Sequence, residues 1–244
     1  TVDTDAKVYI GDESYSYVDR FTYLRAGTLA TLYINGRGRV ESIFIGSSTS
    51  DDAVIIAQNG STDGFALLTD RTDYRIYKHG EEVTSRALEA FDVATYSSSN
   101  NTVYISDNRI TVYYEEAYPN AAAPSRIKAK GINGSREDGY LEVLPCALDT
   151  LAKCRVGQTI TLLLTDNNRV AGVSTSASAR GNALGFVDSS GKLTLFNGLE
   201  ASAGQEDLTR YAGQLVTVSS NKSGVSVSRM SSQSVHGDFY VANK

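Results

Sequence analysis

The chain of 244 residues has no tryptophan, one methionine, three prolines, two cysteines and two histidines. It also lacks any run of about 18 apolar residues, so no segment is predicted to span a membrane. No CxxC, HExxH or GxSxG pattern is present, which excludes the common zinc and hydrolase motifs. Gly36 and Gly38 lie outside any phosphate-loop or dinucleotide-binding context, and we interpret them as hairpin-turn residues.

An excess of basic charge is absent as well. The chain has 23 Lys and Arg against 28 Asp and Glu, a formal net charge of −5. Phosphate binding needs a clustered basic face, so we expect no nucleic-acid partner. The basic cluster Arg126, Lys128 and Lys130 alternates along a predicted strand, which is typical of a solvated strand face.

The residues that are abundant favour strands and turns. Hydrophobic residues make up 41% of the chain and tyrosine occurs 15 times, which is enough apolar surface for a packed core. Many Tyr, Thr, Val and Ser residues punctuated by Gly and Asn favour strands over helices. We therefore predict a mainly β protein, built from tandem small antiparallel β-barrel or β-sandwich modules with short helical turns.

One stretch recurs along the chain. In residues 157–173 the apolar Ile160, Leu162 and Leu164 alternate with threonines, and an Asp-Asn-Asn turn follows. This pattern predicts a half-buried strand that enters a hairpin. Residues 27–40 and 213–229 carry versions of the same pattern.

Four modules with the order strand, glycine, helical turn, glycine, hairpin are predicted from this recurrence. They cover residues 1–50, 53–118, 126–173 and 185–229, and Phe91 replaces a glycine in the second. The expected helical turns include 19–25, 85–91, 146–153 and 206–211. We expect an extended connector at 118–124 and one more strand at 235–241, the last module being complete or truncated. Residues 1–118 and 119–244 are then two related halves.

Two histidines offer candidate chemistry. His79 lies beside Glu81 and Glu82, a composition that suits acid–base work or metal binding. We favour a turn histidine beside solvated acids, because zinc or triad chemistry needs several partners. His236 precedes Gly237 and Asp238 and has a turn composition too.

The carboxylates do not indicate a particular kind of site either. Glu115 and Glu116 are adjacent on a predicted strand, so their side chains are expected on opposite faces. Asp63, Asp70 and Asp73 could hold calcium, but the EF-hand spacing is absent. We predict no catalytic residue, no metal site and no cofactor, and calcium binding by surface loops is left open.

Tyrosines could form a binding face for sugars or proteins. The candidates are Tyr15, Tyr17, Tyr23, Tyr33, Tyr113, Tyr114 and Tyr118. Tyrosine is also a favoured strand residue, and no tryptophan is available for a sugar platform. We favour scaffold tyrosines and keep an adhesin or carbohydrate-binding module as the alternative.

Cys146 and Cys154 lie at the two ends of a predicted short helix. Eight residues of helix span about 12 Å, beyond the roughly 7 Å at which two Cα atoms can be bridged. We expect two small buried thiols with no disulfide between them.

Residues 73–80, 118–120, 157–164 and 169–173 resemble the β-rich repeat region of secreted Firmicute surface proteins that also carry S-layer homology domains. The resemblance implies an extracellular, cell-wall-associated, non-catalytic structural or interaction segment. The implied partners are cell-wall polymers or neighbouring surface proteins. No S-layer homology domain is recognisable here, and the chain begins at Thr1 without a signal-like segment. We therefore expect a mature or excised piece whose anchor lies elsewhere in its parent.

Overall fold

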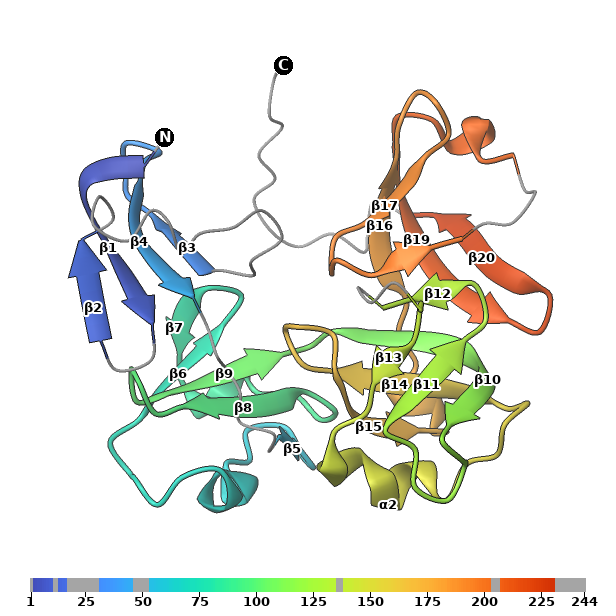
Figure 1. Ribbon diagram of the computed structural model, residues 1–244, viewed down its shortest axis with the longest axis horizontal. Coiled ribbons are helices and arrows are strands. Elements are labelled where there is room, and N and C mark those ends of the chain that lie inside the picture. Colours follow the sequence, from blue (N-terminus) through green and yellow to red (C-terminus); the bar gives the residue numbers. More distant parts are fainter. Residues whose placement is uncertain are drawn as a thin grey trace. The chain divides into compact units, whose positions relative to one another are not determined.

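The computed structural model describes residues 2–10, 13–16, 31–45, 53–134, 138–202 and 207–230. These residues form four β-sheets joined by short helical turns, so the mainly β prediction is confirmed (Figure 1). The chain divides into two compact units, one of residues 1–108, 143–151 and 163–173 and the other of residues 109–142, 152–162 and 174–244. The relatedness of residues 1–118 to 119–244 stays a prediction.

The first sheet has the strand order β2-β1-β4-β3. Its strands are β1 (Val2–Ile10), β2 (Glu13–Ser16), β3 (Thr31–Ile34) and β4 (Val40–Ile45). Strand β1 pairs with β4 in parallel, whereas β1–β2 and β3–β4 are antiparallel. The predicted β3–β4 hairpin is therefore confirmed, and the helical turn expected at 19–25 lies outside the described residues.

The second sheet has the order β5-β8-β9-β6-β7, with β6 and β9 again parallel. Its strands are β5 (Val54–Ile55), β6 (Arg75–Lys78), β7 (Glu81–Val83), β8 (Val93–Ser97) and β9 (Thr102–Ser106). The 3-10 helices are η2 (Asp63–Leu67) and η3 (Ser85–Ala87). Phe65 lies in η2 and is 1% exposed, so its apolar side chain fills the core from a helical turn.

The third sheet has the order β15-β14-β10-β11-β12-β18, and β13 pairs with β11. Its strands are β10 (Arg109–Tyr118), β11 (Arg126–Ala129), β12 (Ile132–Asn133), β13 (Leu141–Glu142), β14 (Thr159–Leu164), β15 (Val170–Ser174) and β18 (Glu200–Ala201). Residues 118–124, expected as an extended connector, instead belong to the loop of the antiparallel β10–β11 hairpin, in which Tyr118 pairs with Arg126. Strand β10 is thus part of the third module's sheet and not of the second's.

Two short helices precede β14. The helix expected at 146–153 is present as η4 (Pro145–Ala147) followed by α2 (Leu148–Leu151). No helix of the described residues has the length and apolar character needed to cross a membrane.

Strand β14 departs from the half-buried strand that its alternation predicts. Thr161 and Leu163 are 2% exposed each, as buried as Leu162 and Leu164 on the other face. The run Leu162-Leu163-Leu164 already breaks the alternation, as is typical of strands covered on both faces. Buried Thr161 shares a hydrogen bond of 3.1 Å with the hydroxyl of Thr111 on β10, which offsets its desolvation.

The fourth sheet has the order β17-β16-β19-β20 and is antiparallel throughout. Its strands are β16 (Ala183–Val187), β17 (Leu193–Leu195), β19 (Gln214–Asn221) and β20 (Gly224–Arg229). The 3-10 turn η5 (Ala177–Ala179) precedes β16, and η6 (Thr209–Tyr211) lies between β17 and β19 in sequence. The strand expected at 235–241 lies outside the described residues.

Both faces of the second sheet are packed against apolar residues. One face forms a cluster of Ile56, Phe65, Leu88, Ala94, Val103 and Ile105. The other cluster joins Ala53 and Val93 to Leu144, Leu163 and Ala171, with Ile55 and Phe91 packed around it. Because Leu144, Leu163 and Ala171 come from the third module, the second and third modules share a core.

A residue with positive φ precedes each of the three later hairpins. These residues are Phe91 (φ 74°), Gly157 (94°) and Gly213 (73°). Each donates its backbone amide to a carbonyl near the start of its module: Phe91 to Ile56 at 2.9 Å, Gly157 to Tyr114 at 2.7 Å and Gly213 to Val187 at 2.8 Å. Phe91 therefore occupies the conformation for which the other modules use glycine.

Each of these modules has a middle strand, which lies in sequence between its opening strand and its hairpin. A second positive-φ glycine follows that strand: Gly80 after β6, Gly131 after β11 and Gly198 after β17. Gly80 provides a matched test, because a Cβ added there or at Gly36 would meet no atom within 4 Å and only Gly80 has positive φ. We expect Gly80→Ala to lower the free energy of unfolding by about 1–2 kcal/mol, from the left-handed backbone alone. Gly36→Ala is expected to change it by less than about 0.5 kcal/mol. Urea denaturation followed by far-UV circular dichroism measures both, and equal losses would contradict this account.

Candidate functional site

His79 does not pair with its sequence neighbours Glu81 and Glu82. It adopts φ 56° in the β6–β7 turn, and its Nε2 lies 3.2 Å from Oδ2 of Asp107. The two side chains are 67% and 38% exposed. Glu82 instead accepts the hydroxyl of Tyr77 at 3.3 Å. His236 lies outside the described residues.

Asp166 in the β14–β15 turn is a further carboxylate near this pair. Although the residue is exposed as a whole, burial of its carboxyl group raises its pKa. The negative charge of Asp107 adds to that rise, while a hydrogen bond with Ser106 opposes it. This grouping has no local sequence signal, because its members come from three turns far apart in the chain.

The other predicted carboxylates do not converge. Glu115 binds the ammonium of Lys130 at 2.6 Å, and Glu116 accepts the hydroxyl of Tyr140 at 2.7 Å. Asp63 accepts the hydroxyl of Ser61. Within the described ranges no group of three or more His, Cys, Asp or Glu side chains is arranged to hold a metal ion.

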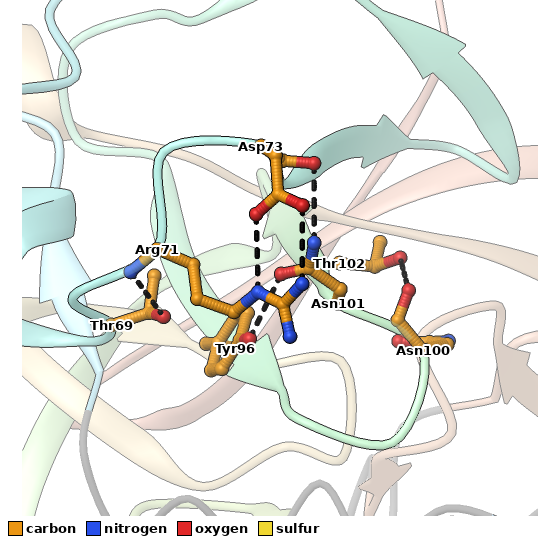
Figure 2. Close-up of polar contacts among 7 residues, drawn as sticks. All are labelled: Thr69, Arg71, Asp73, Tyr96, Asn100, Asn101 and Thr102. Carbon is orange, nitrogen blue, oxygen red and sulfur yellow. Dashed lines mark hydrogen bonds and ion pairs between the residues drawn. The ribbon is translucent and has the colours of Figure 1, made fainter.

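Asp73 belongs to a polar clamp between the η2–β6 loop and the β8–β9 turn (Figure 2). Nε and Nη2 of Arg71 each donate to its carboxylate at 3.1 Å, and Nδ2 of Asn101 donates to its backbone carbonyl at 3.1 Å. Tyr96 in turn donates its hydroxyl to Oδ1 of Asn101 at 2.9 Å. The hydrogen bonds from Arg71 first, and from Asn101 second, lower the pKa of Asp73 to about 2.

The most deeply buried charges are Lys78 and Asp92, with side chains 9% and 0% exposed. Nζ of Lys78 lies 2.8 Å from Oδ2 of Asp92 and also donates to the carbonyl of Ala87 at 3.2 Å. The same carboxylate oxygen accepts the amide of Glu89 at 2.9 Å. One ion pair thus fixes the end of β6, the η3 turn and the start of the β8–β9 hairpin.

The densest aromatic and charged cluster lies on β10 and β11. The guanidinium of Arg126 is 4.1 Å from the ring centroid of Tyr118 and 5.0 Å from that of Tyr140. It also binds Asp138 at 2.6 Å. The hydrogen bond to Glu116 is the main cause of the raised pKa of Tyr140. Arg126 was expected on a solvated face, but it is packed between two aromatic rings.

Among the described residues, the candidate tyrosines Tyr113 and Tyr114 do not share a face. Tyr114 is 1% exposed, and burial raises its pKa, whereas the neighbouring Tyr113 points to the other face of β10. Tyr118 is 47% exposed. Tyr17 and Tyr23, and the side chains of Tyr15 and Tyr33, lie outside the described part of the chain.

Both cysteines are free thiols, as expected. The expected burial is wrong for Cys146, which is exposed at the start of η4 and donates its thiol to the carbonyl of Ala171. Cys154 is half-buried, and burial raises the pKa of its thiol.

Comparisons with protein-family models, with curated proteins and with solved structures found no match. The geometry alone shows what the polar residues do. The ion pair of Lys78, the clamp of Asp73 and the stacked Arg126 each fasten a turn or a strand edge. Nζ of Lys78, Oδ2 of Asp92 and the carboxylate of Asp73 are engaged within the protein.

Lys78 and Asp92 should be strongly coupled. We expect Lys78→Met to lower the free energy of unfolding by about 3–5 kcal/mol, because it leaves a buried carboxylate without its counter-ion. Adding Asp92→Asn should restore a large part of that loss. The matched control is Lys130→Met, whose pair with Glu115 is 41% and 31% exposed, so its loss should be much smaller than that of Lys78→Met because water screens an exposed ion pair. Urea denaturation of the four proteins decides it, and equal effects of the two lysine variants would contradict the expectation.

Asp73 should titrate near pH 2. Because its pKa in the folded protein is lowered, the clamp stabilises the fold above the ordinary aspartate pKa of about 3.9, and this contribution is lost as pH falls toward 2. We expect Arg71→Gln to move the midpoint up toward the ordinary value in an NMR titration of the carboxyl carbon. The exposed Arg86 serves as control, since Arg86→Gln should leave the midpoint unchanged. A wild-type midpoint near 4 would refute the clamp.

Proposed function

We propose that this chain is a non-catalytic structural and interaction segment of a bacterial cell-surface protein, built from four copies of one small β module. The observation that carries the proposal is the recurrent hydrogen bond from a positive-φ residue to the opening strand. It is made by Phe91, Gly157 and Gly213 in three modules of different sequence. Unrelated segments have no reason to share both the backbone conformation and the partner.

The strand orders also support duplication. The first and second sheets contain the equivalent orders β2-β1-β4-β3 and β7-β6-β9-β8, each with its middle strand parallel to the last hairpin strand. The third and fourth sheets contain the equivalent orders β15-β14-β10-β11 and β20-β19-β16-β17. The agreement within each pair is what a duplicated module predicts.

All of these orders can be drawn from one ring of four strands. In order around the ring, these are the opening strand (β5, β10 or β16), the first hairpin strand (β3, β8, β14 or β19), the second hairpin strand (β4, β9, β15 or β20) and the middle strand (β1, β6, β11 or β17). The second sheet is open between its opening and middle strands, and the third and fourth are open between the middle and second hairpin strands. None of the sheets closes over the described residues. We propose that each module is one small barrel whose sheet is open between two neighbouring strands, and that the open position is not the same in every module.

The polar chemistry favours a structural role. The most buried ion pair fixes a turn, and the residue with the lowest pKa, Asp73, closes a loop clamp. An acid–base or nucleophilic site would need such groups to face a substrate with their hydrogen bonds available. The cell-surface location, with cell-wall polymers or neighbouring surface proteins as partners, is supported by the sequence resemblance.

The alternative is an adhesin or carbohydrate-binding module. The observation in its favour is Tyr118, 47% exposed beside Arg126 and Tyr140. Its ring is already in contact with the guanidinium of Arg126, which reduces the surface open to a sugar. The structural role is therefore preferred.

Surface labelling tests the proposal. Antibodies raised against the purified chain should label intact cells of the source bacterium before permeabilisation. The purified chain should release no reducing ends or free amines from cell-wall sacculi above the buffer control. The doubly substituted His79→Ala, Glu82→Ala protein should match the wild type in both assays. Labelling only after permeabilisation, or hydrolysis lost in that variant, would overturn the proposal.

A further inference from the structure

The opening strands of the second and fourth modules pair with their hairpins in the same register. Ile55 pairs with Val93 in the second module, and Phe186 pairs with Leu215 in the fourth. The hydrogen bonds from Phe91 to Ile56 and from Gly213 to Val187 set this equivalence. Two residues earlier in each module, and therefore on the same face, Ala53 of the second module corresponds to Leu184 of the fourth.

In the second module this face is covered by its neighbour. Ala53 and Val93 are 6% and 1% exposed, and Ile55 packs beside them. The covering residues are Leu144, which precedes η4, and Leu163 and Ala171 of the β14–β15 hairpin. The packing is close, because a Cβ on Gly172 would lie 3.2 Å from the Ile55 side chain.

The opening strand of the third module also contacts a hairpin strand of the module that follows it. Tyr113 of its opening strand is the equivalent of Ile55 and Phe186. Its backbone amide donates to the hydroxyl of Ser220, at the end of the first hairpin strand of the fourth module, at 3.1 Å. A hairpin strand of the following module thus meets the opening strand of the preceding one at two places in the chain.

The same face of the fourth module is open. Leu184 and Phe186 are each 38% exposed, and the adjacent Phe196 is 58% exposed. Phe196 donates its amide to the carbonyl of Leu184, so the three side chains lie on one face of β16 and its neighbour. In the described residues the other exposed large hydrophobic side chains, Ile34, Leu67, Tyr118 and Val156, do not lie on this sheet. A grouped apolar patch of this kind marks an interaction surface.

The β3–β4 hairpin has the geometry needed to cover this face. Its turn repeats the turn of the covering β14–β15 hairpin bond for bond. The amide of Asn35 donates to Arg39 at 2.8 Å and that of Thr165 to Arg169 at 3.0 Å. The side-chain oxygens of Asn35 and Thr165 each accept the amide of that same partner at 3.1 Å. Gly38 and Asn168 have φ 71° and 61°.

We propose that the face of Leu184, Phe186 and Phe196 binds the β3–β4 hairpin of a second copy of this chain, as the second module binds the β14–β15 hairpin of the third. This inference rests on the repeated module of the proposed function. The two surfaces are different, so the contact is head-to-tail and builds rings or open filaments instead of closed dimers. The partner surface protein is then the protein itself.

One position sets the strength of the contact. With the turns aligned, Glu41 of β4 stands where the covering hairpin has Ala171, and Glu41 is exposed. A carboxylate placed against an apolar face must lose part of its hydration. The contact between copies is therefore weaker than the junction inside the chain, and association is reversible.

Sedimentation velocity of the 244-residue chain, from about 1 to 200 μM, tests the proposal; weak association of this kind has a dissociation constant on the order of 10–100 μM. We expect concentration-dependent association that Phe186→Ser or Leu184→Ser weakens about tenfold or more. Glu41→Ala should strengthen it. Leu67→Ser removes an equally apolar side chain that is 78% exposed on η2 and should leave association unchanged. Far-UV circular dichroism checks that each variant is folded.

Mixing two defective chains distinguishes head-to-tail contact from a face-to-face dimer. Phe186→Ser keeps an intact hairpin, and Tyr33→Lys, at the position that aligns with Leu163 of the covering hairpin, keeps an intact apolar face. Each variant alone should stay monomeric, whereas the mixture should form dimers that do not grow further. A wild type that stays monomeric at 200 μM, or a Tyr33→Lys chain that still dimerises, would overturn the proposal. Either result would leave the surface-labelling test of the proposed function unaffected.

Discussion

Each later module of this chain depends on one backbone constraint, a residue with positive φ whose amide closes the hairpin onto the opening strand. Gly157 and Gly213 adopt it without a side-chain penalty, whereas Phe91 adopts it against one. Phe91 is tolerated because its ring packs around the cluster of Ala53, Val93 and Leu163. Apolar contact offsets a backbone conformation that glycine would adopt freely.

The buried Lys78–Asp92 pair is coupled to the same constraint. Lys78 directly precedes the positive-φ residues His79 and Gly80, and Asp92 directly follows Phe91. The ion pair therefore ties the left-handed turn of His79 and Gly80 to the left-handed residue Phe91, with the η3 turn held between them by the carbonyl of Ala87. The pair also donates and accepts beyond itself, from Lys78 to the carbonyl of Ala87 and from the amide of Glu89 to Asp92, which offsets part of the cost of burying the two charges.

The positions of several turns and hairpins could be predicted from the sequence, because turns and strands have local signals. Gly80, Gly131, Gly157 and Gly213 mark left-handed positions, and the β8–β9, β14–β15 and β19–β20 hairpins follow from apolar alternation. The polar groupings could not be predicted. His79 contacts Asp107, and Arg126 contacts Tyr140 and Asp138. These contacts join residues that are distant in sequence, and they form only when the whole sheet has folded. The burial of Lys78 could not be predicted either, since an isolated lysine in a strand is expected to be exposed to solvent.

In strand β14, packing against a neighbouring module changes the pattern of apolar residues in the sequence. Position 163 faces the preceding module, and there the third module has leucine where the fourth has Ser219, so an apolar run replaces alternation only in the third. On the receiving side, Ala53 and Ile55 are covered, whereas their equivalents Leu184 and Phe186 are larger and stay exposed. A face that only contacted water would have no reason to enlarge its apolar side chains. The fourth module therefore has the chemistry of an interior module at a position where this chain supplies no neighbour among its described residues.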